Sequence, residues 1–204
     1  MLLEINWPLW LTTMIPLAMS AGPGNLMVAT SGAQSGVRRS VLFIAGLDIA
    51  YFVISMLVGL GLYHTLMSEP ALVWGLRVAG SIYIMWLGMR LLLRPMISTN
   101  NENLDLQFRD GVMVQLGNVQ GLVMLLVMFS TFIPTGKTSS SVVLALSFAL
   151  ISLNFIAHLI WVSLGATIQK LLSARPELLR AQNAVFGLML IAVAVWIFIR
   201  TDSL

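Results

Sequence analysis

One acidic residue, Asp48, is embedded in the apolar sequence FIAGLDIAYF, which covers residues 43–52. It is the only acidic residue deep inside any apolar segment of the chain. A carboxylate inside a membrane costs at least about 2.5–3.5 kcal/mol unless it is paired, hydrated or protonated, and such residues mark proton relays and substrate sites. Asp48 is therefore predicted to carry a proton or to bind a substrate ammonium group. The alternative interpretation is a structural aspartate that bonds to a neighbouring helix or lies near interfacial water.

A proline and two glycines interrupt another apolar segment, in the sequence SAGPGN of residues 20–25. Proline removes a backbone donor and clashes with the preceding turn, so we expect a helix that is broken inside the membrane. The N-terminus of a half-helix favours a carboxylate. Gly22, Pro23, Gly24 and Asn25 are therefore predicted to bind substrate. The alternative is a packing kink, because Gly and Pro are frequent in membrane helices.

Four further polar residues lie in the apolar segments of the second half of the chain. Asn118 and Gln120 stand near the start of one segment, and Asn154 and His158 share one helix face because they are four residues apart. We predict that Asn118, Gln120 and Asn154 bind substrate. His158 is predicted to take part in proton coupling with Asp48, since histidine changes its charge near neutral pH. The alternatives are interhelical hydrogen bonds and a neutral histidine.

The composition indicates that these residues are carried by membrane helices. Hydrophobic residues make up 58% of the 204 residues, charged residues 9%, and the mean hydropathy is +0.93. Because an average soluble domain is about a quarter charged, a soluble enzyme, a nucleic-acid binder and a disordered chain are excluded as main interpretations. The chain has 0 cysteines, which excludes thiolate metal sites. It also lacks a phosphate-binding loop and hydrolase motifs, so we expect neither an enzyme nor a cofactor.

Six segments reach the roughly 20 apolar residues that span a bilayer, namely 7–30, 41–62, 71–93, 111–133, 142–168 and 184–199. The sequence thus predicts an all-α membrane protein with six transmembrane helices in a single transporter domain, 1–204. Residues 95–110 are interpreted as a mobile or interfacial linker between the halves 1–94 and 111–204. Lys and Arg concentrate in the first, third and fifth connections, which the positive-inside rule places in the cytoplasm. Both termini are then expected to be extracytoplasmic.

The two halves carry similar features at corresponding positions. Each half begins with a helix that carries a Gly-Asn break near one end, Gly24-Asn25 in the first half and Gly117-Asn118 in the second, and Asp48 corresponds to Asn154. Three helices per half give the halves opposite topology, which is the plan of many secondary transporters. We therefore expect a 3+3 inverted-topology repeat with a broken first helix.

Residues 20–40, with the sequence SAGPGNLMVATSGAQSGVRRS, resemble the signature of the lysine exporter (LysE/RhtB) family of bacterial amino-acid exporters. That signature is a Pro-Gly-Pro followed by Asn residues, an apolar run, small residues and basic residues. Gly22, Pro23 and Asn25 match it, whereas Ala21 and Gly24 replace its first Pro and first Asn. The stretches GLDIAYF and GSIYIMWLGMRLL and the final apolar segment are also similar to the family, so the resemblance covers nearly the whole chain.

The resemblance implies a multi-pass protein of the bacterial inner membrane that exports an amino acid or related small metabolite, coupled to the proton gradient. Its partners would be that small molecule and membrane lipid, and a homodimer is compatible with the resemblance. The fourth span of the family usually begins Asn-Pro-Lys, whereas this chain has Asn118-Val119-Gln120. Any contact that the lysine makes with a substrate or a carboxylate is therefore lost here.

Two alternatives remain at the level of the sequence. A metal-cation efflux carrier would need clustered ligands, for which one Asp, one intramembrane His and no Cys are a poor set. A membrane enzyme would need a nucleophile with a base or paired metal ligands, for which only Asp48 and His158 are candidates. A structural subunit of a complex would need neither the aspartate nor the broken helix. The sequence does not select among amino-acid substrates, coupling ions or oligomeric states.

Overall fold

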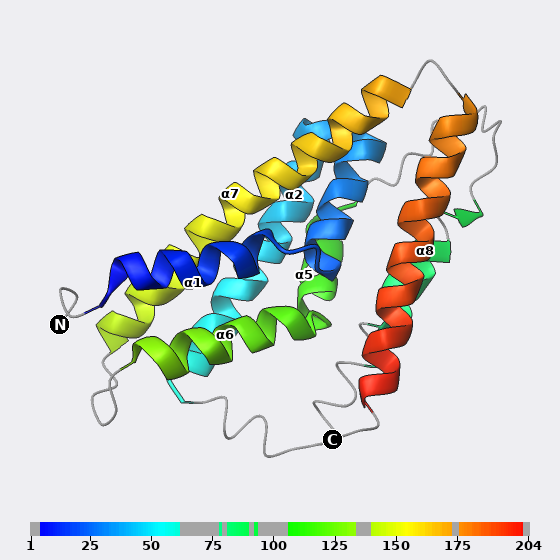
Figure 1. Ribbon diagram of the computed structural model, residues 1–204. Coiled ribbons are helices and arrows are strands. Elements are labelled where there is room, and N and C mark those ends of the chain that lie inside the picture. The colour runs from blue at the N-terminus through cyan, green and yellow to red at the C-terminus, as the bar shows by residue number, and fades with distance from the viewer. Residues whose placement is uncertain are drawn as a thin grey trace.

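The structure is a computed structural model that describes residues 5–61, 78, 81–89, 92–93, 106–133, 140–172 and 176–201. Its main elements are the helices α1 (Trp7–Met19), α2 (Pro23–Gly59), α5 (Phe108–Leu116), α6 (Val119–Phe132), α7 (Ser140–Leu172) and α8 (Pro176–Thr201), shown in Figure 1. Residues 81–89 are also helical. No strand occurs in the described residues, and the predicted all-helical class is therefore confirmed for them.

Two of these helices, α2 and α7, are long and apolar enough to cross a membrane. The pair α5 and α6, bent by 66°, adds a third if it is counted as one span. Most of the predicted third span, 71–93, lies outside the described residues. The arrangement of six spans therefore stays a prediction.

The predicted first span, 7–30, is divided into two helices, as the proline and glycines led us to expect. Helix α1 ends at Met19, and α2 begins at Pro23, which occupies the first turn where its missing N–H costs nothing. Gly22 is the N-cap of α2 and provides no side-chain capping bond. The break therefore leaves backbone N–H groups at the start of α2 without a side-chain cap.

The connection that we predicted between the first two spans, residues 31–40, is helical apart from Gly36. At Gly36 the backbone turns with φ 77° and ψ 168°, a conformation that is essentially restricted to glycine. The Ser31 and Ser40 hydroxyl groups lie 2.8 Å apart, although nine residues of straight helix would separate them by about 13.5 Å. Helix α2 is thus a hairpin with the arms 23–35 and 37–59, and its 37 residues do not form one straight span. The chain reverses within the predicted connection, but it does so at one glycine and not through a loop of ten residues.

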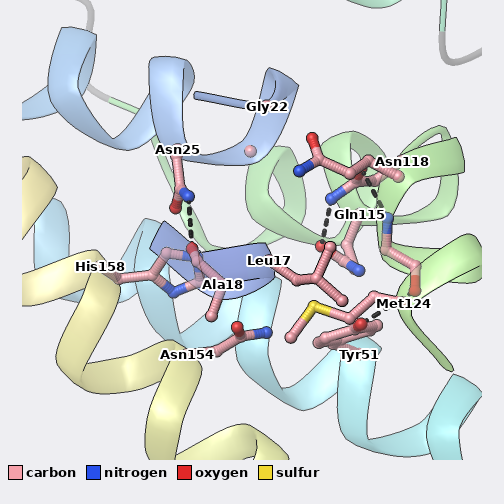
Figure 2. Close-up of a pocket in the computed structure, with 13 residues that line it drawn as sticks. Leu17, Ala18, Gly22, Asn25, Tyr51, Gln115, Asn118, Met124, Asn154 and His158 are labelled. Carbon is pink, nitrogen blue, oxygen red and sulfur yellow. Dashed lines mark hydrogen bonds between the residues drawn. The ribbon is translucent and has the colours of Figure 1, made fainter. Parts of the chain in front are cut away.

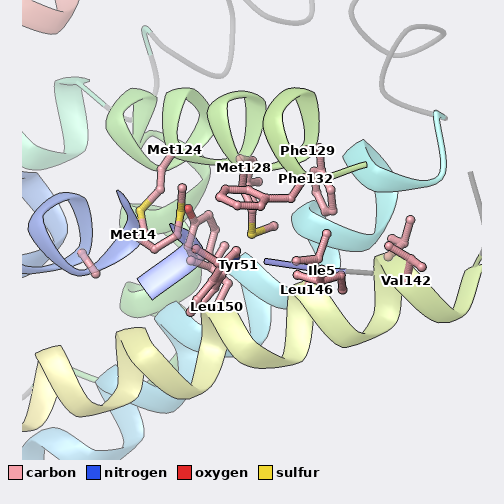
Figure 3. Packing of buried hydrophobic residues seen from close by; sticks show 14 of the residues in the cluster. Ile5, Met14, Tyr51, Met124, Met128, Phe129, Phe132, Val142, Leu146 and Leu150 are labelled. Carbon is pink, nitrogen blue, oxygen red and sulfur yellow. The ribbon is translucent and has the colours of Figure 1, made fainter. Parts of the chain in front are cut away.

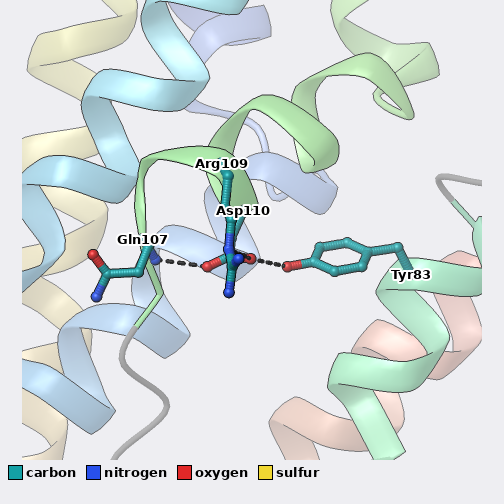
Figure 4. A network of polar contacts seen from close by, with 4 residues as sticks. All are labelled: Tyr83, Gln107, Arg109 and Asp110. Atoms are coloured by element: carbon teal, nitrogen blue, oxygen red, sulfur yellow. Dashed lines mark hydrogen bonds and ion pairs between the residues drawn. The ribbon is translucent and has the colours of Figure 1, made fainter.

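The predicted linker 95–110 ends earlier than expected, because α5 already begins at Phe108. The side chain of Asp110 accepts the backbone N–H of Gln107 at 2.7 Å and so caps the helix. The Tyr83 hydroxyl donates to the other Asp110 oxygen at 2.7 Å, which joins the helical residues 81–89 to α5 (Figure 4). Arg109 has its Nε atom 4.0 Å from an Asp110 oxygen, and its side chain is 87% exposed. Residues 95–105 lie outside the described part.

The predicted fourth span, 111–133, is broken where the sequence has Gly117-Asn118. Helix α5 ends before Gly117, and Asn118 caps α6 by accepting the Gly121 N–H at 3.1 Å. Helix α7 extends beyond the predicted 142–168, and α8 begins eight residues before the predicted 184. Much of the connection that we expected between the last two spans is therefore helical as well.

Helix α2 packs mainly on α7 and α5, and glycines bring the backbones into contact at both crossings. A Cβ atom at Gly165 of α7 would lie 2.8 Å from the Ala29 carbonyl carbon of the first arm. A Cβ atom at Gly46 of the second arm would lie 2.9 Å from the Phe108 carbonyl carbon of α5. Real Cβ atoms do not approach this closely, so glycine is required for these crossings.

Two apolar clusters fill the space around these crossings. The first joins α2, the helical residues 81–89, α7 and α8, and the second joins α1, α6, the second arm of α2 and the first half of α7. Figure 3 shows the second cluster, with side chains of α6 above those of α7. Tyr51 and Met124 belong to this cluster and also line the cavity described next.

Candidate functional site

The two helix breaks face a single cavity of about 40 Å³, which is large enough to hold water. Its walls come from α1, α2, α5, α6 and α7, as Figure 2 shows. The lining residues are Leu17, Ala18, Gly22, Gly24, Asn25, Tyr51, Gln115, Asn118, Gln120, Gly121, Met124, Asn154 and His158. About half of these residues have polar side chains, and none of them is a lysine, an arginine or a carboxylate.

Most of the residues that the sequence singled out meet at this cavity. The structure brings together Gly22, Gly24, Asn25, Asn118, Gln120, Asn154 and His158. Pro23 does not line the cavity, because its ring is buried in the first turn of α2. Asp48 does not line it either, and its position is described below.

Asn25 holds the first break together. Its Nδ2 atom donates to the carbonyl oxygens of Ala18 and Ser20, each at 2.7 Å, and so satisfies two carbonyl groups at the end of α1. Both amide hydrogens of Asn25 are thereby used. The side chain has only its carbonyl oxygen left to offer to a ligand, which makes it an acceptor for a group such as an ammonium.

The second break presents amide groups from the opposite side of the cavity. Asn118 Nδ2 donates to Gln115 Oε1 at 3.3 Å, which leaves one amide hydrogen of Asn118 without a described partner. A Cβ atom at Gly24 would lie 3.3 Å from that Nδ2 atom, so the two breaks are in close contact. Gln120 crosses to the first break, where its Nε2 atom donates to the Ser20 hydroxyl.

Asn154 of α7 forms no hydrogen bond with another described residue, although its side chain is only 9% exposed and lines the cavity. Figure 2 shows its amide directed into the space between His158 and Tyr51. Buried polar groups are normally hydrogen-bonded, and one without a partner in the protein indicates a site for water or a ligand. Asn154 therefore has a donor and an acceptor available for a bound molecule.

Asp48 and His158 form a buried pair behind the cavity wall. The Asp48 Oδ1 and His158 Nδ1 atoms are 3.0 Å apart, and the two residues are 6% and 7% exposed. The atoms are at ion-pair distance but are not aligned as a hydrogen bond, and Asp48 Oδ2 has no partner among the described residues. His158 lines the cavity and Asp48 does not, so the imidazole links the cavity to the carboxylate.

Several lining residues were not predicted from the sequence, notably Tyr51, Gln115, Gly121 and Met124. Each of them stands three or four residues from a predicted site residue and so shares its helix face or turn. Tyr51 follows Asp48 in this way, and its hydroxyl donates to the Gly121 carbonyl oxygen at 2.9 Å. Gln115 precedes Asn118. Gly121 stands three residues after Asn118, and Met124 stands four residues after Gln120. Spacing on the helix could therefore have identified all four residues.

Metal-ligating side chains do not cluster in the described residues. No group of three or more His, Cys, Asp or Glu side chains occurs among them, so the part of the chain that the structure describes offers no ready cation site. Asp48 and His158 are a pair and supply two ligands at most.

Comparison with known proteins identifies the family of the chain. Residues 15–201 match the LysE type translocator family. The cysteine/O-acetylserine efflux protein of Escherichia coli (strain K12) is 26% identical over 189 residues, which are 93% of this chain and 95% of the relative. The protein of the same name from Escherichia coli O139:H28 (strain E24377A / ETEC) is 27% identical with the same coverage. No solved structure matches the chain significantly. The chain therefore belongs to the LysE type translocators, a family of membrane transporters and not of enzymes.

Proposed function

We propose that the protein is a secondary transporter that exports a small amino acid or a related metabolite across the bacterial inner membrane, coupled to the proton gradient. The observation that carries this proposal is the polar cavity between two broken helices in a chain that is otherwise strongly apolar. Transporters place substrate at such breaks, because the freed backbone groups can be satisfied there by a ligand. Relatives named as cysteine/O-acetylserine efflux proteins support an amino-acid substrate.

The cavity has separate partners for the two charged groups of an amino acid. The carboxylate would lie at the uncapped start of α2, where Gly22 and Gly24 line the cavity and the helix dipole favours an anion. The ammonium would lie toward the carbonyl oxygens of Asn25 and Asn154 and toward His158. A lining without lysine, arginine or carboxylate favours a substrate whose side chain is uncharged.

The Asp48–His158 pair is our candidate for proton coupling. His158 faces the cavity and touches Asp48, whose second carboxylate oxygen has no described partner. A proton could thus pass between the cavity and a buried carboxylate through one imidazole. We assign Asp48 to the proton and not to direct contact with the ammonium, because it stands behind His158.

The cavity would open alternately to the two sides of the membrane as one half of the chain moves against the other. This fits the position of the cavity, because the first break belongs to residues 1–94 and the second to residues 111–204. We therefore retain the inverted 3+3 repeat of six spans, with both termini extracytoplasmic, as part of the proposal.

The test is reconstitution of the purified protein in liposomes with a panel of labelled amino acids, with and without an imposed pH gradient. We expect one small amino acid to move, and to move faster with the gradient. Asparagine has the size of aspartate but cannot ionise. Asp48→Asn should therefore abolish the acceleration of transport by the pH gradient and leave membrane insertion unchanged. Glu177→Gln removes an exposed carboxylate of α8 and is the matched control. Full gradient-driven transport by Asp48→Asn would refute the assigned role.

A further inference from the structure

One side-chain contact joins the two helix breaks directly. Ser20 is the C-cap of α1, and its hydroxyl accepts a hydrogen bond from the Nε2 atom of Gln120 in the first turn of α6. The two residues are 100 positions apart in the sequence and belong to different halves of the chain. Gln120 lines the cavity, so the contact lies at the cavity wall between α1 and α6.

Gly22 provides the space in which this contact forms. A Cβ atom at residue 22 would lie 2.6 Å from the Gln120 Cδ atom and would overlap the side-chain amide. Real Cβ atoms essentially never approach another atom so closely. The Gln120 amide therefore occupies the volume that any larger residue at position 22 would need, and the glycine and the contact depend on each other.

The contact differs in kind from the close approaches at Gly46 and Gly165. At Gly46 and Gly165 the atoms nearest to an added Cβ are backbone atoms of α5 and of the first arm of α2. Backbone atoms at these two crossings cannot rotate aside as a side chain can, so an added Cβ atom there would require the helices themselves to shift. At Gly22 the nearest atoms are the end of a flexible side chain, which can rotate away without moving a helix.

We propose that Ser20 and Gln120 form a latch that closes the cavity where α1 and α6 cover it. On that side the cavity is lined by Leu17 and Ala18 of α1 and by Met124 of α6. While the Ser20–Gln120 hydrogen bond is formed, it holds α1 against α6. With Gln120 rotated away, α1 and α6 separate and water enters from that side. The inference rests on the proposed function only in taking the cavity as the substrate path.

The natural absence of cysteine allows a direct test of the latch. Met124→Cys places the only thiol of the chain at the cavity wall. Its reaction rate with a charged, water-soluble thiol reagent is measured on the purified protein in detergent. When Ser20→Ala or Gln120→Ala is combined with Met124→Cys, the labelling rate should rise about fivefold, which is the shift expected when one typical hydrogen bond is lost. Ser130→Ala, at an exposed serine of α6 that bonds only within its helix, should leave the rate unchanged.

Gly22→Ala provides a second, independent test of the latch. It should raise the labelling rate as Gln120→Ala does, because the added methyl group expels the amide. The double variant Gly22→Ala/Gln120→Ala should label no faster than either single variant, since both changes break the same contact. Unchanged labelling in Ser20→Ala and Gln120→Ala would overturn the latch, and so would multiplicative effects in the double variant.

The labelling assay requires no substrate, which separates the latch from the proposed function. Faster labelling in variants of a protein that transports no amino acid would support the latch and contradict the function. Transport with unchanged labelling would support the function and contradict the latch. If Gln120→Ala fails to fold, Ser20→Ala and Gly22→Ala still decide the question.

Discussion

Replacing Asn154 by leucine should stabilise the protein and abolish transport. The Asn154 side chain is 9% exposed and forms no hydrogen bond with another described residue. A buried amide without a partner costs about 1–3 kcal/mol, and leucine has a similar size without that cost. Since water in the cavity offsets part of the penalty, we expect a gain near the lower limit of this range.

A gain of about 1 kcal/mol corresponds to a rise in melting temperature of about 2–4 °C for a chain of this length. The melting temperature is measured in detergent, and transport of the amino acid identified above is measured in liposomes. The two readouts should move in opposite directions, because Asn154 is expected to serve the ligand and not the fold.

Ser147→Ala is the matched control on the same helix. Ser147 is fully buried and its hydroxyl lies 2.8 Å from that of Ser55, away from the cavity lining. Loss of an interhelical hydrogen bond of about 0.6 kcal/mol should lower the melting temperature slightly and leave transport intact. If Asn154→Leu instead melts at a lower temperature than the unchanged protein, or transports at full rate, then Asn154 is a structural residue and our reasoning fails.

Three further substitutions test the fold around the site. Gly36→Ala places a Cβ atom in a backbone region essentially restricted to glycine, so it should destabilise the protein by about 1–3 kcal/mol, measured by thermal unfolding in detergent. Gly46→Ala forces α2 away from α5 and should cost about 1–3 kcal/mol in the same assay, whereas a neutral result would mean that the crossing is looser than described. Tyr83→Phe removes the 2.7 Å bond to Asp110 and should lower stability by about 1 kcal/mol or more; unchanged unfolding would show that this bond does not hold the helical residues 81–89 against α5.

Local chemistry explains why parts of the fold were predictable. A proline flanked by glycines ends a helix wherever it stands, so the break after Met19 followed from residues 20–25 alone. The end of α5 at Gly117-Asn118 followed in the same way, because asparagine caps the helix after it. The turn at Gly36 was missed, since ten small and polar residues resemble a loop and the sequence does not indicate that a single glycine reverses the chain.

The candidate site was predictable as a list of residues but not as an arrangement. Asn25, Asn118, Asn154 and His158 stood out because polar groups are costly in apolar segments, and all four line the cavity. The contact of Asp48 with His158 was not predictable, because it joins two helices 110 residues apart in the chain and depends on how each is rotated about its axis. The use of both Asn25 amide hydrogens within the break was also hidden, since it depends on where the last turn of α1 ends.

The sequence by itself determined that this is an apolar helical chain, that two helices are interrupted, and that one carboxylate is buried. These properties depend on transfer free energies and backbone chemistry, which act residue by residue. Only the tertiary structure decided that the two interruptions face one cavity, that Asp48 stands behind His158, and that Gln120 reaches Ser20. Such contacts depend on where helices cross. The crossings at Gly46 and Gly165 bring together segments that are far apart in the sequence, and their separation along the chain does not reveal that they are in contact.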